Sequence, residues 1–237
     1  MAFITGAFNA FLNGFFPASC PHCGLSSKYP RYSPFCSDCW QELKISAYNG
    51  PSCKICGEPF ESEHGTVCGE CLKDRPAFAR VYAYGLFEGV LKEAIHSYKF
   101  GAIRRLSAPL SELLLSLELP AVDAVTSVPL SKKRLLERGF NQSMLVGKEI
   151  ARISGAELLP HALKKVKDTP PQAELNRKER VLNLKGAFAC GGEVEGKTVL
   201  LIDDVITTGT TARECSKALV KAGAKEVCVA ALARTKK

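Results

Sequence analysis

The sequence predicts an α/β fold, with a mostly parallel sheet covered by helices on both faces, preceded by a small cysteine-rich domain. Two observations support this prediction. Eight of the 11 cysteines stand in CxxC pairs before residue 72, and beyond residue 76 strand-like apolar runs alternate with helical periodicity. The chain has 237 residues, 46% of them hydrophobic, which is enough for a domain of ordinary size beside a smaller one.

The first 17 residues are predicted to form an apolar helix. No charged side chain precedes Lys28, yet the run contains Asn9 and Asn13 and stops at Pro17. It is therefore too short and too polar for a membrane span, and it lacks the basic start of a signal peptide. We expect a cytoplasmic protein whose residues 1–17 cover the metal domain or pair with a partner; contact with a membrane surface is the alternative.

The predicted cysteine-rich domain covers residues 18–75, and the larger domain covers residues 76–237. The boundary falls at Asp74, Arg75 and Pro76, a polar break before the first apolar run.

The four CxxC pairs predict two structural zinc sites. Each CxxC turn aims two thiolates at one ion, and two turns complete the tetrahedron that Zn²⁺ prefers. A disulfide scaffold would be typical of a secreted chain, and a redox motif would occur once. The simplest pairing is sequential, although spacing alone leaves a crossed arrangement open. The proposed ligand sets are Cys20, Cys23, Cys36 and Cys39, and then Cys53, Cys56, Cys68 and Cys71.

The sequence of the first half of the larger domain predicts a strand, two helices and a second strand. Residues 80–87 alternate like a strand, and residues 88–100 carry apolar side chains at helical spacing. A second helix is expected over 105–117, and a strand over 121–129.

The second half continues the alternation around one long polar segment. Asn141 should cap a helix over 141–154, and residues 157–166 are expected to form a short strand. Residues 168–186 are polar and basic, and loops of that length are usually functional or disordered. After them come the short run AFAC, a strand over 199–203, a helix over 211–223 stopped by Gly223, and a strand over 226–233.

The stretch VLLIDDVITTGTT, residues 199–211, predicts a phosphate and sugar site. Asp203 and Asp204 should lie at the carboxyl edge of the sheet, where open α/β folds bind ligands. The next residues offer backbone N–H groups, hydroxyls and a helix N-terminus to a phosphate. An ordinary capped helix would need only one such residue. A ribose 5-phosphate fits both parts, with its diol on the acids and its phosphate on Thr207, Thr208, Gly209, Thr210 and Thr211.

These 13 residues resemble the signature of type I phosphoribosyltransferases for 5-phosphoribosyl 1-pyrophosphate (PRPP). The whole chain resembles the ComF family of competence and DNA-uptake proteins. That resemblance rests on the cysteine pairs, on residues 91–106 and 127–143, on the segment from Gln172 to Asn183 with Phe188 after it, and on the PRPP stretch. It implies a double zinc ribbon in front of a type I phosphoribosyltransferase fold, and a role in natural transformation.

The basic stretch SVPLSKKRLLERGFNQS predicts the other end of the site. A strand ends at Val128-Pro129, and the turn after it resembles a pyrophosphate loop; a solvated basic helix start is the alternative. We assign the pyrophosphate to Pro129, Leu130, Ser131, Lys132 and Lys133, with Arg134 and Arg138 nearby. The resemblance also makes the 168–186 loop a hood, in which Arg177, Lys178 and Arg180 would contact pyrophosphate or nucleic acid.

The resemblance implies a Mg²⁺-dependent transfer of phosphoribosyl from PRPP, in which Asp203 and Asp204 steady the ribose and the acceptor is unknown. Thr207 stands where purine-salvage relatives carry a carboxylate, which puts that chemistry in doubt. The alternative is a non-catalytic protein that binds single-stranded DNA or senses PRPP. Single-stranded DNA and DNA-uptake or helicase machinery at the membrane are the expected partners. The segments 29–32, 98–100 and 138–140 combine basic and aromatic residues that suit base stacking and core packing equally.

Overall fold

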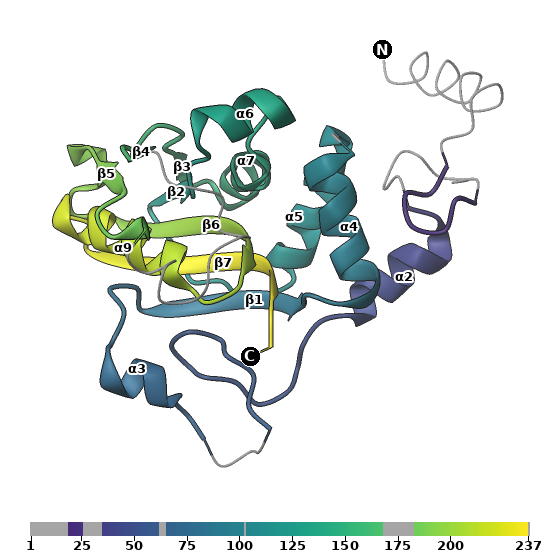
Figure 1. The fold of residues 1–237 in the computed structure, drawn as a ribbon, viewed down its shortest axis with the longest axis horizontal. Coiled ribbons are helices and arrows are strands. Elements are labelled where there is room, and N and C mark those ends of the chain that lie inside the picture. The colour runs from purple at the N-terminus through teal and green to yellow at the C-terminus, as the bar shows by residue number, and fades with distance from the viewer. Residues whose placement is uncertain (1–18, 26–34, 62–64, 102, 168–182, 237) are drawn as a thin grey trace.

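The computed structural model describes residues 19–25, 35–61, 65–101, 103–167 and 183–236. Its centre is a five-stranded sheet in the order β1-β7-β6-β2-β3, and every neighbouring pair is parallel (Figure 1). The strands are β1 (Arg80–Leu86), β2 (Ala124–Ser127), β3 (Glu157–Leu158), β6 (Thr198–Ile206) and β7 (Glu226–Arg234). The predicted parallel α/β sheet is therefore confirmed.

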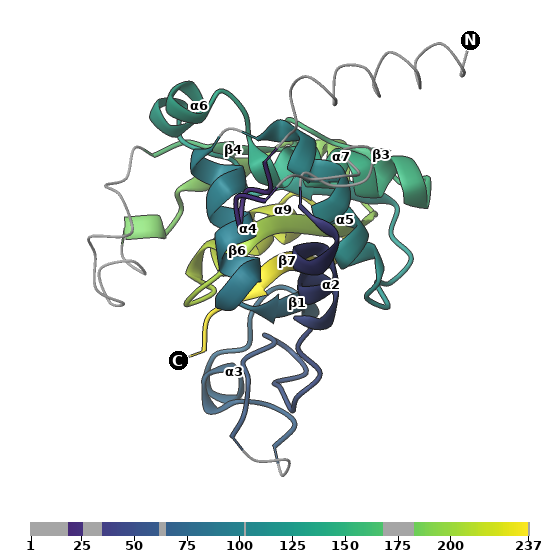
Figure 2. The same cartoon turned by 90° about the vertical axis from the view of Figure 1, so that its right-hand side faces the viewer.

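Each face of the sheet packs into its own apolar core. The helices are α2 (Ser37–Ile45), α3 (Gly69–Lys73), α4 (Gly89–Phe100), α5 (Ser107–Leu115), α6 (Lys132–Arg138), α7 (Gln142–Ser154) and α9 (Thr210–Lys221). Helices α4, α5 and α7 cover one face, where Leu200 and Ile202 of β6 point; α9 covers the other, where Val199 and Leu201 point (Figures 1 and 2). Strand β6 is thus buried on both sides, as a central parallel strand should be.

The predicted strand over 157–166 divides into two. Residues 157–158 form β3 at the edge of the main sheet, whereas β4 (Leu163–Lys165) pairs antiparallel with β5 (Phe188–Cys190) in a separate two-stranded sheet. The chain turns at Pro160 and His161 between them, because proline has no N–H to continue a ladder.

The predicted turn over Lys132–Arg138 is wrong, because these residues form helix α6. The side chain of Ser131 caps its start by accepting from Arg134 N at 3.3 Å, and Gly139 ends it in the left-handed conformation, φ 73°. Lysine, arginine, leucine and glutamate are good helix formers, so a cap and a glycine stop suffice. Asn141 caps α7 as predicted, accepting from Met144 N at 3.2 Å.

The predicted end of the acidic strand at residue 203 is also too early. Strand β6 continues to Ile206, because Asp203, Val205 and Ile206 pair with Ala231, Ala233 and Arg234 of β7. Both acids therefore stand on rigid strand rather than on the loop that follows.

The two cysteine-rich segments pack against different parts of the sheet domain. In Figure 1, α2 of the first segment lies beside α4, and α3 of the second lies below β1. The Tyr84 hydroxyl donates to Leu43 O and Lys44 O at 2.9 and 2.7 Å, which fixes α2 to strand β1. In the part of the chain described here, no helix is long and apolar enough to cross a membrane. The predicted helix over 1–17 lies outside the described residues.

Candidate functional site

The eight paired cysteines form two groups with the geometry of tetrahedral metal sites. The sulfur atoms of Cys20, Cys23, Cys36 and Cys39 all lie within 4.8 Å of one another, and so do those of Cys53, Cys56, Cys68 and Cys71. The pairing is sequential. The Sγ–Sγ distances of Cys23–Cys36 and Cys56–Cys68 are both 3.6 Å, close to the edge of about 3.8 Å that a tetrahedron with Zn–S bonds of about 2.3 Å requires.

Both groups are built from the same two local structures. The first CxxC of each is a tight turn closed by a glycine at positive φ, Gly24 at 74° and Gly57 at 68°. The second CxxC begins a helix, so that Cys36 and Cys68 are the N-cap residues of α2 and α3. A helix N-terminus favours thiolates through its dipole.

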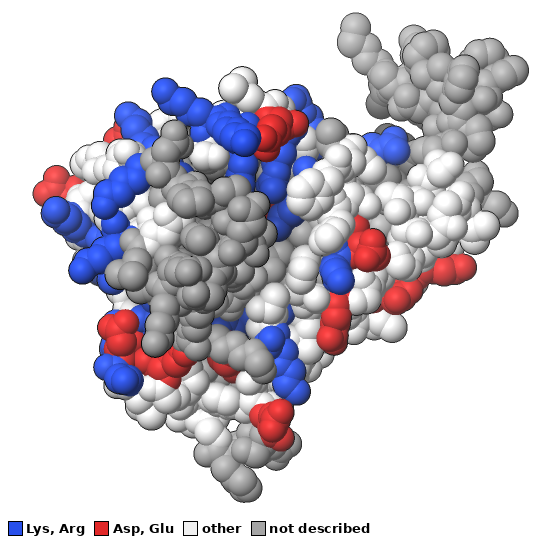
Figure 3. Space-filling view, viewed as in Figure 1, with Lys and Arg blue, Asp and Glu red and all other residues white. Residues whose placement is uncertain are grey.

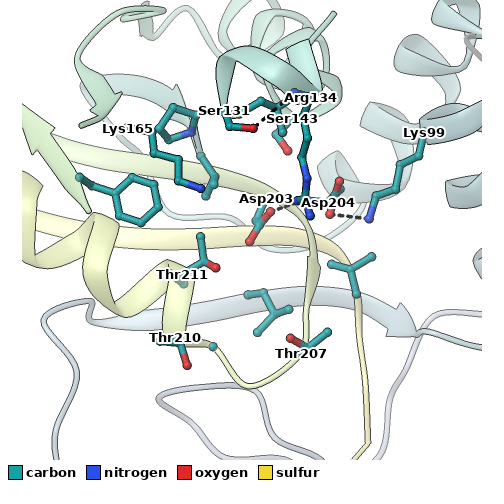
Figure 4. Close-up of a pocket in the computed structure, with 18 of the residues that line it drawn as sticks. Lys99, Ser131, Arg134, Ser143, Lys165, Asp203, Asp204, Thr207, Thr210 and Thr211 are labelled. Carbon is teal, nitrogen blue, oxygen red and sulfur yellow. Dashed lines mark hydrogen bonds and ion pairs between the residues drawn. The ribbon is translucent and has the colours of Figure 1, made fainter. Parts of the chain in front are cut away.

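The two acids of β6 point to opposite faces of the sheet, because they are neighbours on one strand. Asp204 faces α4, where its Oδ1 lies 2.8 Å from Lys99 Nζ with both side chains mostly buried (Figure 4). The preceding residue, Tyr98, joins this end of α4 to the start of α7, because its hydroxyl donates to Gln142 O at 3.0 Å. Asp203 accepts from Asp204 N at 2.9 Å.

Burial, together with the nearby charge of Asp204, raises the pKa of Asp203 to about 7. The negative charge of Asp204, which Lys99 offsets only in part, disfavours a second negative charge on buried Asp203, and a cation or a pair of hydroxyl donors would relieve that cost. Oxygen ligands of this kind also suit Mg²⁺.

The threonine loop, residues 207–211, follows directly from β6 and runs into α9. Gly209 is the N-cap of α9 and has a φ of 76°, which glycine adopts without strain. Thr208 Oγ1 and Thr210 Oγ1 lie 2.9 Å apart. The first N–H groups of a helix have no intrahelical partners, so this loop has the composition and position of an anion site.

The opposite wall comes from the end of β2 and from α6. Asn141 Nδ2 donates to Val128 O at 3.0 Å, which fixes the turn from Pro129 to Ser131 beside the cap of α7. Arg138 donates to Gln142 Oε1 at 3.2 Å and lies over the ring of Phe100, 5.2 Å from its centroid.

A cavity of about 490 Å³ joins these parts. The predicted site residues that line it are Asp203, Asp204, Thr207, Gly209, Thr210, Thr211, Pro129, Leu130, Ser131, Arg134 and Arg138. Lys132 and Lys133 are exposed on α6 and do not line it. Thr208 belongs to the loop but lines a second, smaller cavity instead of this one. Figure 3 shows Lys and Arg gathered over α6 and below it. Arg177, Lys178 and Arg180 lie outside the described residues.

Sequence reasoning missed two lysines of the cavity wall. Lys99 extends into the cavity from α4, and Lys165 points into it from β4 (Figure 4). Lys165 pairs in register with Phe188 of β5, which also lines the cavity. Neither Lys99 nor Lys165 lies in a sequence pattern typical of phosphate binding. Lys99 and the neighbouring Phe188 do belong to the segments on which the family resemblance rests. Of the aromatic residues considered for base stacking, Tyr98 and Phe140 are buried core residues, whereas Phe100 is 71% exposed.

Comparison with known proteins defines the class. A model of the double zinc ribbon domain matches residues 11–72, and a model of the phosphoribosyl transferase domain matches residues 163–237. The chain is thus a double zinc ribbon, with two Cys₄ zinc-binding sites, joined to a phosphoribosyltransferase-like domain.

Three relatives then identify the family. Competence protein F of Haemophilus influenzae is 33% identical over 233 residues, covering 93% of this chain and 98% of the relative. DNA utilization protein YhgH of Escherichia coli is 34% identical, covering 77% and 84%. Competence protein ComFC of Bacillus subtilis is 28% identical, covering 79% and 78%. The chain belongs to the ComF family of competence and DNA utilization proteins, so the family resemblance of the sequence is confirmed.

Proposed function

We propose that the cavity binds PRPP together with Mg²⁺, and that the protein is a phosphoribosyltransferase acting in the uptake of transforming single-stranded DNA. One observation carries the proposal: two walls suited to anions, the threonine loop and the α6 side, face each other across paired carboxylates in one cavity. PRPP has the same order of groups, a phosphate, a diol and a diphosphate.

In this arrangement the threonine loop and the N-terminus of α9 hold the 5-phosphate. Asp203 and Asp204 accept hydrogen bonds from the ribose hydroxyls, and Arg134, Arg138 and the Pro129–Ser131 turn hold the diphosphate. As the acceptor attacks the anomeric carbon, the bond to the diphosphate breaks, the carboxylates stabilise positive charge on the ribose, and the arginines stabilise negative charge on the leaving group. Asp203 and Asp204 would also be the residues to hold Mg²⁺, which would offset further negative charge on the leaving group.

The role in DNA uptake is supported by the relatives, which are named for competence and for DNA utilization. Single-stranded DNA and uptake or helicase machinery are the partners that follow from it. The exposed lysines of α6 lie beside the cavity mouth, where a nucleic acid backbone would find positive charge.

The direct test is release of pyrophosphate from Mg·PRPP in the presence of bases, amines or single-stranded DNA. Acceptor-dependent release would identify the acceptor. If no acceptor tried gave release although Mg·PRPP raised the melting temperature, the enzymatic part of the proposal would be wrong and the binding part would stand.

A second candidate is a PRPP sensor or DNA-binding protein without turnover. The residues that line the cavity favour this second candidate. Among the described lining residues, Asp203 and Asp204 are the only carboxylates, and the first position of the loop that follows their strand is Thr207. Without a further carboxylate, a general base for the acceptor has to come from elsewhere.

Binding of Mg·PRPP should strengthen as the pH rises through 7. The ligand needs Asp203 ionised, and the pKa of Asp203 is raised to about 7 in the free protein. Binding therefore releases a proton at pH 6, and affinity there should be about tenfold weaker than at pH 8, levelling off above. Calorimetry at several pH values, in buffers of different ionisation enthalpy, measures both effects.

The control for that titration is Asp203→Asn, which has no proton to release at this position. The PRPP phosphates titrate near the same pH, and the variant reports their contribution alone. An identical pH dependence in wild type and variant would contradict the assigned role of Asp203.

Replacement of the basic residues of α6 should distinguish PRPP binding from binding of single-stranded DNA. Arg134→Ala and Arg138→Ala remove cations that line the cavity and should each weaken Mg·PRPP binding about tenfold. Lys132 and Lys133 lie outside the cavity. Lys132→Ala and Lys133→Ala should therefore leave PRPP binding unchanged, and should reduce both the affinity for single-stranded DNA and the salt dependence of that affinity. Fluorescence anisotropy with labelled DNA at several salt concentrations checks the second effect, and DNA affinity that does not depend on salt would oppose it.

A further inference from the structure

The second Cys₄ site, Cys53 to Cys71, lies directly against the segments that carry the threonine loop. Arg213 of α9 places its Nη2 3.9 Å from Cys71 Sγ, and Arg234 at the end of β7 places its Nη2 3.9 Å from Cys56 Sγ. Cysteines 53, 56 and 71 share one apolar core with Ile206 and Ala212, which flank the loop. The first Cys₄ site belongs to the other core, beside α4.

Charge explains why two arginines gather there. Four thiolates around Zn²⁺ leave a net charge of −2, and nearby donors to metal-bound sulfur hold such ligands in place. Arg234 is only 2% exposed and pairs with Glu58 of the second zinc ribbon. Its Nε and Nη1 atoms are buried without a hydrogen-bond partner among the described residues, so the negative zinc–thiolate group supplies compensation that Glu58 alone does not.

The backbone of each arginine residue also contacts the segments that carry the threonine loop. Arg213 N donates to Gly209 O at 2.9 Å, which closes the first turn of α9 immediately behind the loop. Its guanidinium donates to Asp74 O at 2.9 Å and to an Asp74 carboxylate oxygen at 3.1 Å, so the side chain spans α9 and the end of the second ribbon. Arg234 pairs in register with Ile206, the residue before Thr207, and Thr235 N donates to Ile206 O at 3.0 Å.

A small cavity marks where these parts meet. Cys56, Thr208, Gly209, Arg213 and Arg234 all line it. The rear of the threonine loop, opposite its ligand side, therefore rests on a zinc ligand and on both arginines. A shift of this site would move the loop, since packed interiors transmit displacement.

We propose that Arg213 and Arg234 are positioning residues that tie the second zinc site to the threonine loop, so that zinc at this site sets the loop's affinity for anions. By linkage, an anion on the loop must in turn raise the affinity of this site for zinc. We expect this gain in affinity to be measurable as slower loss of zinc from the site. The tie itself follows from contacts within the chain, whereas the identity of the anion as PRPP rests on the proposed function.

The test follows each zinc site separately in the full-length, zinc-loaded protein. Zinc is withdrawn with a chelator while exposed thiols are alkylated, and mass spectrometry reports the rate for each cysteine. Arg213→Met should accelerate alkylation of Cys53, Cys56, Cys68 and Cys71 about tenfold and leave Cys20, Cys23, Cys36 and Cys39 unchanged. Arg213→Lys keeps the charge without the fork of donors and should fall between.

A matched control is Arg152→Met on α7, an exposed arginine paired with Glu149, which should change neither site. Unchanged rates in Arg213→Met, or equal acceleration at both sites, would overturn the tie.

The coupling is measured with inorganic phosphate and, separately, with Mg·PRPP. Either anion should slow alkylation at the second site in wild type, and the protection should be lost in Arg213→Met. If Mg·PRPP raised the wild-type melting temperature but left the alkylation rates unchanged, the coupling would be wrong and the proposed function intact. If phosphate protected the second site and PRPP did not bind at all, the coupling would hold and the proposed function would fail.

Discussion

The double variant Asp203→Asn/Asp204→Asn is expected to lose the thermal stabilisation that Mg·PRPP gives the wild type. A hydrogen bond to a charged group contributes about 1.5–3 kcal/mol, so removal of both carboxylates should weaken binding at least 100-fold. The amides keep the shape of the cavity while removing its negative charge and its capacity to bind a cation. The shift in melting temperature over a series of PRPP concentrations, with and without Mg²⁺, measures the loss.

A matched control comes from the same part of the surface. Glu137→Gln removes a carboxylate from the exposed face of α6 without touching the cavity lining, and it should leave the PRPP shift unchanged. An equal PRPP shift in wild type and in the double variant would show that the acids are not part of the binding site.

The single variant Asp203→Asn also gives a readout that does not depend on ligand. Because the folded pKa is raised, the folded state binds more protons than the unfolded state between about pH 4 and pH 7, and wild-type stability falls as pH rises through that range. The variant should therefore melt about 5 °C above wild type at pH 8, and the difference should shrink toward pH 5. This gain would show that Asp203→Asn is folded, so that weaker PRPP binding by this single variant is not a loss of folding.

The threonine loop and the zinc ligands could be predicted because their signals are local. Four apolar residues, two acids and a glycine among threonines lie within 13 positions, and the turn and the helix start of each zinc site lie within a few residues of their cysteines. The parallel sheet followed from the same kind of evidence, a strand apolar on both faces.

What sequence reasoning missed depends on distant contacts. Lys99 meets Asp204 across 105 positions, and Arg234 meets Glu58 across 176. No periodicity connects such residues, and a lysine or arginine at a helix or strand end is more often solvated. Helix α6 differs from the prediction for a local reason. Its basic residues are typical of a phosphate loop, but the cap at Ser131 and the stop at Gly139 make the same residues a helix.

The pair Arg234–Glu58 joins the second zinc ribbon to the end of β7 in a buried environment, with side chains 2% and 10% exposed. Arg234→Met leaves the Glu58 carboxylate in that environment without its guanidinium partner, and breaking a buried pair in this way costs about 3–5 kcal/mol. Chemical denaturation followed by circular dichroism should show this loss. The double variant Arg234→Met/Glu58→Leu removes both charges and should recover part of it, as expected of coupled neighbours.

The neighbouring pair Lys236–Glu61 offers a control with the same topology. It also joins the C-terminal segment to the second zinc ribbon, but its side chains are 57% and 88% exposed. Lys236→Met should therefore cost less than about 1 kcal/mol. An equal loss of unfolding free energy in Arg234→Met and Lys236→Met would show that the buried Arg234–Glu58 pair does not stabilise the contact between the second zinc ribbon and the sheet. A large loss confined to Arg234→Met, in a single unfolding transition, would instead mean that the second zinc ribbon and the sheet unfold as one cooperative unit. The boundary expected at residues 75–76 would then mark a change in amino-acid composition, and not a division between two independently stable domains.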